Sequence, residues 1–377
     1  MDGSNSRLSP VLELRRNVEL PFERARAMPK SVYTSDAFLQ KEISEIFAKE
    51  WFCVGRVDGL PNPGDFMALE LAGQPVMVVR DHRGILRAQA NVCRHRMSVL
   101  LEGRGNRRTI VCPYHGWTYG LDGRLRGAPA MTRNEGFDRS QYRLPQIRCE
   151  EWLGWILVSL NPEIESAASK LARIEKMIGD YDMASYKQAF FETWEWNTNW
   201  KVLAENFMES YHLPVCHAAS IGGLSKVDDV ECPHGYDEFN YHTLQKEETF
   251  TLSIAHPNNR RLKGERRFTT YLLSIYPSMM VTLTPGYFWY LSLYPLETGK
   301  VRIYFGGGMS KEFAEDPDSE RHFSELRKLL DVVNLEDRTC TERVYAGLVS
   351  DFPSPGHLSH LELPNYEFAQ YLSRKVQ

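Results

Sequence analysis

Two pairs of metal-binding side chains stand close together in the first half of the sequence. Cys93 and His95 form a Cys-x-His pair, and Cys112 and His115 form a Cys-x-x-His pair that begins after sixteen intervening residues. A zinc finger would usually pair cysteines with cysteines in its first half and carry its second pair on a helix, whereas both pairs here follow predicted strands. Two thiolates and two imidazoles instead suit a [2Fe–2S] cluster in which sulfur binds one iron and nitrogen binds the other.

A second group of candidate ligands lies near the middle of the chain. If a helix begins near residue 200, its period places Glu205, Glu209 and His212 on one side, opposite an apolar side. Pro214 is expected to end this helix just past His212 and to turn the chain, so that His217 returns towards His212. Two imidazoles with a carboxylate beside them suit a divalent transition metal.

The first half of the chain is predicted to hold an all-β domain. Residues 1–45 are expected to form an extended arm and a helix, capped by Ser35, that packs on the second domain. Short alternating segments broken by turns then predict a β domain over 46–162. Its expected strands are 51–57, 65–71, 76–80, 85–92, 109–112, 117–119, 124–126 and 152–160.

The remaining residues, 163–377, are predicted to form a second domain of helices and strands. Residues 220–265 are polar and lack a clear period, so we expect a long loop that covers a site. An amphipathic helix is predicted over 318–344. The other expected elements are a helical stretch over 163–181 and strands over 190–196, 268–284, 288–296 and 301–307.

Composition excludes several classes of protein. The 377 residues carry a net charge of -4, so nucleic acid is not an expected partner. No long apolar run is present and the first residues are charged, which predicts no membrane span and a cytoplasmic location. The seven cysteines are an odd number spread over a long chain, which favours reduced thiols over a disulfide framework.

Both groups of candidate ligands resemble those of a known family. Cys93-x-His95 together with the run Cys112–Trp117 closely resembles the Rieske motif, and residues 199–217 are similar to the catalytic domain of Rieske non-haem iron oxygenases. The resemblance covers almost the whole chain. It implies an α+β protein with a Rieske [2Fe–2S] domain and a helix-grip-like catalytic domain, in which a curved antiparallel sheet is combined with helices.

The resemblance also implies a mononuclear Fe(II) site. In that family two histidines and a later carboxylate form a facial triad that leaves positions open for O₂. His212 and His217 match the two imidazole ligands. Asp331, Glu336 and Asp337 are the candidates for the carboxylate; Asp337 occupies the matching place, and the other two are expected to be solvent-facing charges.

Glu209 matches the family's bridging carboxylate. There, such a residue links a cluster histidine of one subunit to an iron ligand of the next, so the resemblance implies a head-to-tail homotrimer in which Glu209 connects His212 to His115 of a neighbouring copy. Most members have aspartate at this position, and glutamate resembles the quaternary-ammonium branch, such as carnitine and betaine oxygenases. Glu205 has no assigned role beyond supporting a ligand.

The resemblance therefore implies a terminal oxygenase that receives electrons from a separate NAD(P)H-dependent flavin and iron–sulfur reductase. It would use O₂ to hydroxylate or N-demethylate a quaternary ammonium or related small amine. Two alternatives are an oxygenase that hydroxylates aromatic rings or O-demethylates aryl ethers, and a Rieske electron carrier without oxygenase activity. Aromatic residues of the second domain would suit an ammonium group through cation–π contact or a flat ring equally well. They are Trp194, Trp196, Tyr271, Tyr276, Tyr287, Phe288, Trp289 and Tyr290.

Overall fold

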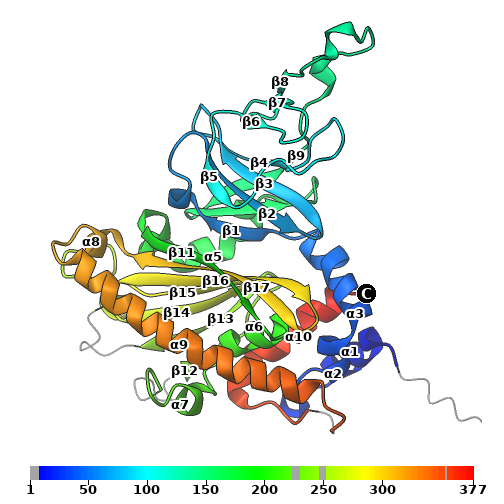
Figure 1. The fold of residues 1–377 in the computed structure, drawn as a ribbon. Coiled ribbons are helices and arrows are strands. Elements are labelled where there is room, and N and C mark those ends of the chain that lie inside the picture. The colour runs from blue at the N-terminus through cyan, green and yellow to red at the C-terminus, as the bar shows by residue number, and fades with distance from the viewer. Residues whose placement is uncertain (1–7, 223–229, 246–251, 353–354) are drawn as a thin grey trace, which may run out of the picture. The chain divides into compact units, whose positions relative to one another are not determined.

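The computed structural model describes residues 8–222, 230–245, 252–352 and 355–377. The chain divides into two compact units (Figure 1). One is Phe47–Ala172, and the other combines Met1–Ile46 with Arg173–Gln377. The described residues contain no helix that is both long and apolar enough to cross a membrane.

The unit Phe47–Ala172 is built from two antiparallel sheets. The larger has the strand order β1-β10-β9-β4-β3-β2-β5, and the smaller has the order β6-β7-β8. The strands are β1 (Phe52–Arg56), β2 (Asp65–Leu71), β3 (Gln74–Arg80), β4 (Leu86–Ala90), β5 (Arg104–Asn106), β6 (Ile110–Val111), β7 (Thr118–Tyr119), β8 (Leu125–Gly127), β9 (Gln146–Trp152) and β10 (Trp155–Ser159), and one short helix, α4 (Ala167–Lys170), follows them. β5 and β9 were not predicted; β9 is rich in charge, and its Arg148 and Glu150 pair at 2.6 Å.

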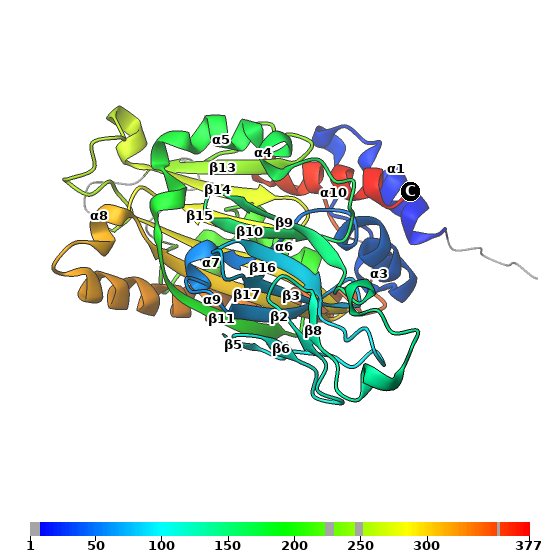
Figure 2. The same ribbon diagram turned by 90° about the horizontal axis from the view of Figure 1, so that it is seen from above.

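The other unit is organised around one curved antiparallel sheet with the order β11-β17-β16-β15-β14-β13-β12. Its strands are β11 (Lys187–Trp196), β12 (Val230–Glu231), β13 (Phe239–Gln245), β14 (Thr269–Ile275), β15 (Met279–Leu283), β16 (Tyr287–Glu297) and β17 (Lys300–Met309). Its helices are α1 (Pro10–Val18), α2 (Lys30–Thr34), α3 (Asp36–Glu42), α5 (Ala172–Ile178), α6 (Trp200–Met208), α7 (Leu213–Cys216), α8 (Lys311–Ala314), α9 (Ser319–Leu348) and α10 (Leu363–Lys375). α1 and α10 lie side by side (Figure 2).

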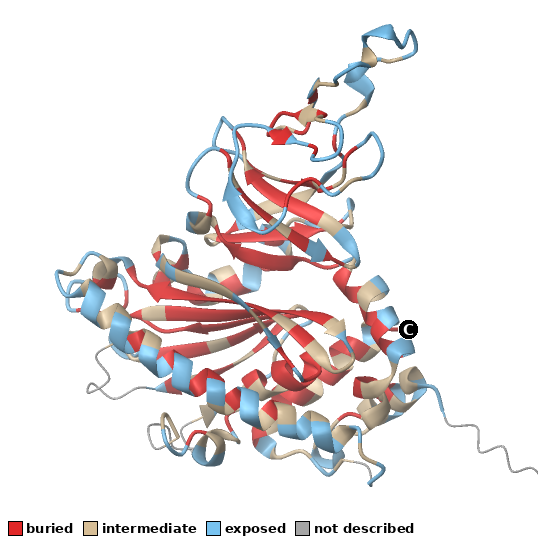
Figure 3. Ribbon diagram, in the orientation of Figure 1, coloured by how far each residue is buried: buried red, intermediate tan, exposed pale blue. Residues whose placement is uncertain are grey.

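The helices α6 and α9 cover the sheet and face each other. α6 contacts β13, β14 and β16, and α9 contacts α6 and β11 (Figure 1). On α9 the buried positions recur at helical spacing, so the helix shows a buried stripe and an exposed one (Figure 3). Leu330, Val333, Asp337 and Thr341 belong to the buried stripe. A carboxylate on that stripe requires partners, because an isolated buried charge is strongly unfavourable.

α6 is anchored by a buried ion pair with the N-terminal helices. Nζ of Lys201 lies 2.8 Å from Oε1 of Glu42, and both side chains are almost fully buried. Nε1 of Trp200 also donates to Glu42 at 3.2 Å. α3 begins where it was predicted to, since Ser35 accepts a hydrogen bond from the backbone N–H of Phe38.

Two predicted elements of this unit were wrong. The predicted loop 220–265 includes β12 and β13; its residues 223–229 and 246–251 lie outside the described part of the chain. The predicted strand 268–284 is a hairpin formed by β14 and β15. The alternation of apolar and polar side chains along β13 is too weak to predict a strand. Its buried polar residues, among them Asn240 and His242, form hydrogen bonds inside the fold.

The cysteine prediction was also wrong in one place. Cys216 on α7 and Cys340 on α9 form a disulfide, although 124 residues separate them in sequence. The fold brings their Cα atoms to 6.7 Å, a proximity that an odd number of scattered cysteines does not reveal. Cys93 and Cys112 are buried and are not disulfide-bonded.

Candidate metal centres

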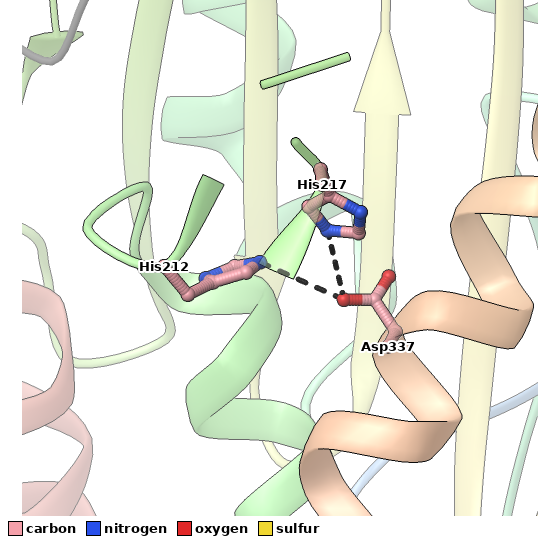
Figure 4. A group of neighbouring side chains, drawn as sticks. All are labelled: His212, His217 and Asp337. Carbon is pink, nitrogen blue, oxygen red and sulfur yellow. Dashed lines mark ion pairs between the residues drawn. The ribbon is translucent and has the colours of Figure 1, made fainter. Parts of the chain in front are cut away.

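Three of the predicted ligands converge in the larger unit. His212 precedes α7, His217 follows it, and Asp337 reaches across from α9 (Figure 4). Oδ1 of Asp337 lies 3.1 Å from Nε2 of His217 and 3.6 Å from Nε2 of His212. The donor atoms all lie within 4.8 Å of one another. These nitrogen and oxygen donors form the set that suits iron in a two-histidine, one-carboxylate site.

The second nitrogen of each imidazole is held by a carboxylate. Nδ1 of His212 lies 2.7 Å from Oε1 of Glu209, and Nδ1 of His217 lies 2.8 Å from Oε2 of Glu336. In a neutral ring the proton therefore belongs on Nδ1, and the Nε2 lone pairs point towards Asp337. Glu336 is not the solvent-facing charge that was predicted, because helix α9 turns it towards His217.

The electrostatics of this site favour a cation. Burial lowers the pKa of His212, but Asp337 and Glu209 outweigh burial and raise the pKa of His212 to about 10. The same competition raises the pKa of His217. Burial raises the pKa of Asp337, but its two histidine partners outweigh burial, so that the pKa of Asp337 is lowered. The residues present therefore fit a divalent metal that would share the three donors.

The local conformation of the ligand loop differs from the prediction. α6 ends at Met208 and Glu209 is extended, so Glu205, Glu209 and His212 do not share one helical side. The carboxylate of Glu209 accepts the backbone N–H groups of Tyr211 and, at 3.0 Å, His212, which starts a new turn in the manner of an N-cap. Pro214 does not end α6; it lies in the first turn of α7, where a missing N–H costs nothing.

The four cluster candidates lie in the smaller unit. Cys93 and Cys112 belong to its hydrophobic core, whereas His95 and His115 are exposed. The imidazole centroids of His95 and His115 are 4.8 Å apart, and His95 stacks on Trp117 at 4.7 Å. Two buried sulfur donors beneath two exposed nitrogen donors fit a cluster with one sulfur-bound and one nitrogen-bound iron.

Hydrogen bonds reach both sulfur atoms, but they favour the thiolate only at Cys112, because burial raises the pKa of Cys93. The hydroxyl of Tyr119 accepts the backbone N–H of Arg94 at 3.0 Å and forms a second hydrogen bond, 3.3 Å long, with Sγ of Cys93. Burial raises the pKa of Cys112, but the backbone N–H groups of Tyr114 and His115 outweigh it, and the pKa is lowered. Sequence reasoning missed Tyr119, although its place in the strand after the second pair was a usable signal.

A cavity of about 130 Å³ opens onto the triad. His212, His217 and Asp337 line it, together with aromatic, aliphatic and hydroxyl side chains from α6, α9 and the sheet. Of the aromatic residues considered from sequence, Tyr287 and Trp289 line the cavity and are joined by Phe207. Phe288 and Tyr290 alternate with them along β16 and are fully buried.

Two comparisons of sequence place the chain among known proteins. The family described as ring hydroxylating alpha subunit (catalytic domain) matches residues 182–377, and the Rieske [2Fe-2S] domain matches residues 50–148. The carnitine monooxygenase oxygenase subunit of Escherichia coli (strain K12) is 28% identical over 352 residues, which cover 92% of this chain and 90% of that protein. The chloroplastic choline monooxygenase of Beta vulgaris is 28% identical over 368 residues, or 95% of this chain and 79% of that protein.

The chain is a Rieske oxygenase alpha subunit. The fold agrees: a crystal structure of the quaternary ammonium Rieske monooxygenase CntA with an inhibitor superposes with a TM-score of 0.81 at 23% identity, covering 96% of this chain and 98% of that chain. This confirms the predicted α+β class. As a Rieske oxygenase, the protein is an oxidoreductase with a Rieske [2Fe–2S] cluster and a mononuclear iron.

Three further residues of this Rieske oxygenase clarify what sequence alone left open. Glu205 is partly buried and accepts hydrogen bonds from the hydroxyl of Tyr33 at 2.8 and 2.9 Å. Asp331 is exposed and pairs with Arg327 at 2.8 Å, as expected for a surface charge. His242, which lay in the predicted loop, is buried, and its Nε2 lies 2.9 Å from Oγ of Ser210.

Proposed function

We propose that this Rieske oxygenase hydroxylates an N-methyl group of a quaternary ammonium compound or a related small amine. The observation that carries the proposal is the cavity, which is lined by Phe207, Tyr287 and Trp289 together with Glu209. Aromatic faces and nearby negative charge both stabilise an ammonium group. The relatives named as carnitine and choline monooxygenases support the same substrate class.

The chain's own residues would have distinct tasks. His212, His217 and Asp337 would hold the mononuclear iron, and Cys93, His95, Cys112 and His115 would hold the cluster. The iron, when bound, supplies the activation of O₂ with electrons from a separate reductase. Glu209 and Glu336 keep both imidazoles turned with Nε2 towards Asp337. The aromatic side chains would orient the methyl group. The C–N bond to the hydroxylated carbon then breaks: the nitrogen keeps the electron pair, the hydroxyl gives its proton to solvent, and the carbon is released as formaldehyde.

A substrate panel tests this proposal. Purified enzyme with a reductase is incubated with quaternary ammonium compounds and, separately, with aromatic acids and aryl ethers, while O₂ uptake and formaldehyde are followed. We expect formaldehyde and O₂ uptake with the ammonium compounds. Turnover of the aromatic compounds alone would replace the proposal with the aromatic alternative.

The proposal of an oxygenase rather than an electron carrier has its own test. We expect iron analysis to find one iron more than the cluster accounts for, and His212→Ala to lose that iron while the cluster's absorption spectrum is unchanged. Asp331→Ala, which removes a surface carboxylate from α9, is the matched control. An iron content equal to that of the cluster alone would contradict an oxygenase.

We further propose that three copies assemble head to tail, with Glu209 of one copy bonded to His115 of the next. His115 is exposed and so is available to another chain, and Glu209 already holds His212 at 2.7 Å. Sedimentation analysis should give a trimer. Glu209→Gln should leave both iron centres filled but slow reoxidation of the cluster in the presence of O₂ and substrate; unchanged reoxidation would contradict the bridging role.

A further inference from the structure

Two residues that line the cavity carry buried hydroxyl groups with no hydrogen-bond partner among the described residues. They are Thr270 on β14 and Thr282 on β15, and both Oγ1 atoms are buried. The two residues are only 3% and 5% exposed. Both line the cavity that opens onto the triad.

The strand register places the two threonines on the same face of the sheet. Thr282 pairs with Leu272, and Leu272 is two positions from Thr270 on β14. The side chains are therefore diagonal neighbours on one face of the sheet. Thr282 also pairs with Trp289 on β16, so the hydroxyl pair adjoins the aromatic wall of the cavity.

Other hydroxyl groups of the same cavity are satisfied within the protein. Ser210 pairs with His242 at 2.9 Å, and Ser253 and Tyr287 are hydrogen-bonded to each other. An unpaired buried hydroxyl destabilises a fold, and valine would fill the same space on a strand. Thr270 and Thr282 therefore present hydrogen-bonding capacity that the fold itself does not use.

We propose that Thr270 and Thr282 form a specificity subsite for an uncharged oxygen-bearing group, a hydroxyl above all, on the substrate's tail. This rests on the proposed function. Neutral hydroxyls satisfy a neutral oxygen well but do not compensate a buried carboxylate. The described lining residues include no lysine or arginine that would pair with a buried carboxylate. The enzyme should therefore favour amines with a hydroxyl tail over those with a carboxylate tail.

Three probes separate these possibilities. Choline carries a hydroxyl, propyltrimethylammonium replaces that hydroxyl with a methyl group, and glycine betaine carries a carboxylate. For the holoenzyme, we expect choline to bind by calorimetry roughly 3- to 10-fold more tightly than propyltrimethylammonium, the range of one net hydrogen bond. Betaine should bind more weakly than choline, and the order of kcat/KM from formaldehyde release should be the same.

Matched variants assign the effect to the two residues. Thr270→Val and Thr282→Val should each reduce the preference for choline over propyltrimethylammonium, and the serine variants should restore it. Thr193→Val, at an exposed position on β11, is the control and should change nothing. Thermal unfolding and the cluster's absorption spectrum establish that each variant is folded.

Each outcome has one meaning. The subsite is supported if the valine variants of Thr270 and Thr282 lose the preference for choline while the serine variants and Thr193→Val keep it. Three results would overturn the subsite: equal affinity for choline and propyltrimethylammonium, tightest binding of betaine, or valine variants that behave like the wild type. If the enzyme still turns over ammonium compounds, the proposed function remains intact in each case. If none of the three compounds binds or reacts, both the subsite and the proposed function fail.

Discussion

Replacing Glu336 should weaken iron binding although Glu336 is not itself one of the three converging donors. Its Oε2 accepts from Nδ1 of His217 at 2.8 Å and from Oγ of Ser220 at 2.5 Å. Loss of such a supporting carboxylate typically costs about 10- to 100-fold in metal affinity. The Glu336 side chain is 18% exposed, so solvent partly compensates, and we expect a loss near the lower limit, about 10-fold, for Glu336→Ala.

The assay is a titration of the mononuclear site with Fe(II) in competition with a chelator. Glu336→Gln should lose less affinity than Glu336→Ala, because the amide oxygen still accepts the imidazole proton. Two positions on the same helix bracket the effect: Asp337→Ala should abolish binding, and Asp331→Ala should leave it unchanged. Equal affinity in wild type and Glu336→Ala would refute the orienting role, and equal loss in Asp331→Ala would show that charge on α9, not contact with His217, matters.

Three other predictions follow from buried contacts. Lys201→Met should lower the free energy of unfolding by about 3–5 kcal/mol in thermal or urea unfolding, because Glu42 is left buried without its cation. If adding Glu42→Gln restores the stability, the ion pair is the cause; a loss below about 1 kcal/mol would contradict the prediction. Burial raises the pKa of Glu205 to about 8 from its usual 4.5, so its contribution to stability is full below pH 4.5 and is lost as the pH rises towards 8. The unfolding temperature of the wild type should therefore fall across that window, and Glu205→Gln should make the fall smaller. Parallel curves of unfolding temperature against pH for the wild type and the variant would contradict this. Tyr119→Phe should lower the reduction potential of the Rieske cluster by on the order of 50 mV in a redox titration, since one hydrogen bond to Sγ of Cys93 is lost. An unchanged reduction potential would show that the hydroxyl does not act on the sulfur.

Elements with a strong local signal could be predicted from the sequence. The strand Asp65–Leu71 and the start of the helix after Ser35 lie where they were expected, and the last long helix, predicted over 318–344, spans Ser319–Leu348. Each depends on residues within a few positions of one another: a period of two, a capping hydroxyl, or an apolar stripe. β13 was missed because its pairing with β14, not its own pattern, makes it a strand.

The sequence by itself was enough to propose the donor types at the two Cys/His pairs and at His212 and His217, because those residues lie within short loops. The tertiary structure decided what faces them. The phase of α9 and its packing against α6 turn Asp337 between the histidines, Glu336 towards His217 and Asp331 to solvent. The Cys216–Cys340 disulfide and the diagonal pair of Thr270 and Thr282 were likewise invisible in the sequence. Each joins segments whose proximity results from sheet register and helix packing, which spacing along the chain does not encode.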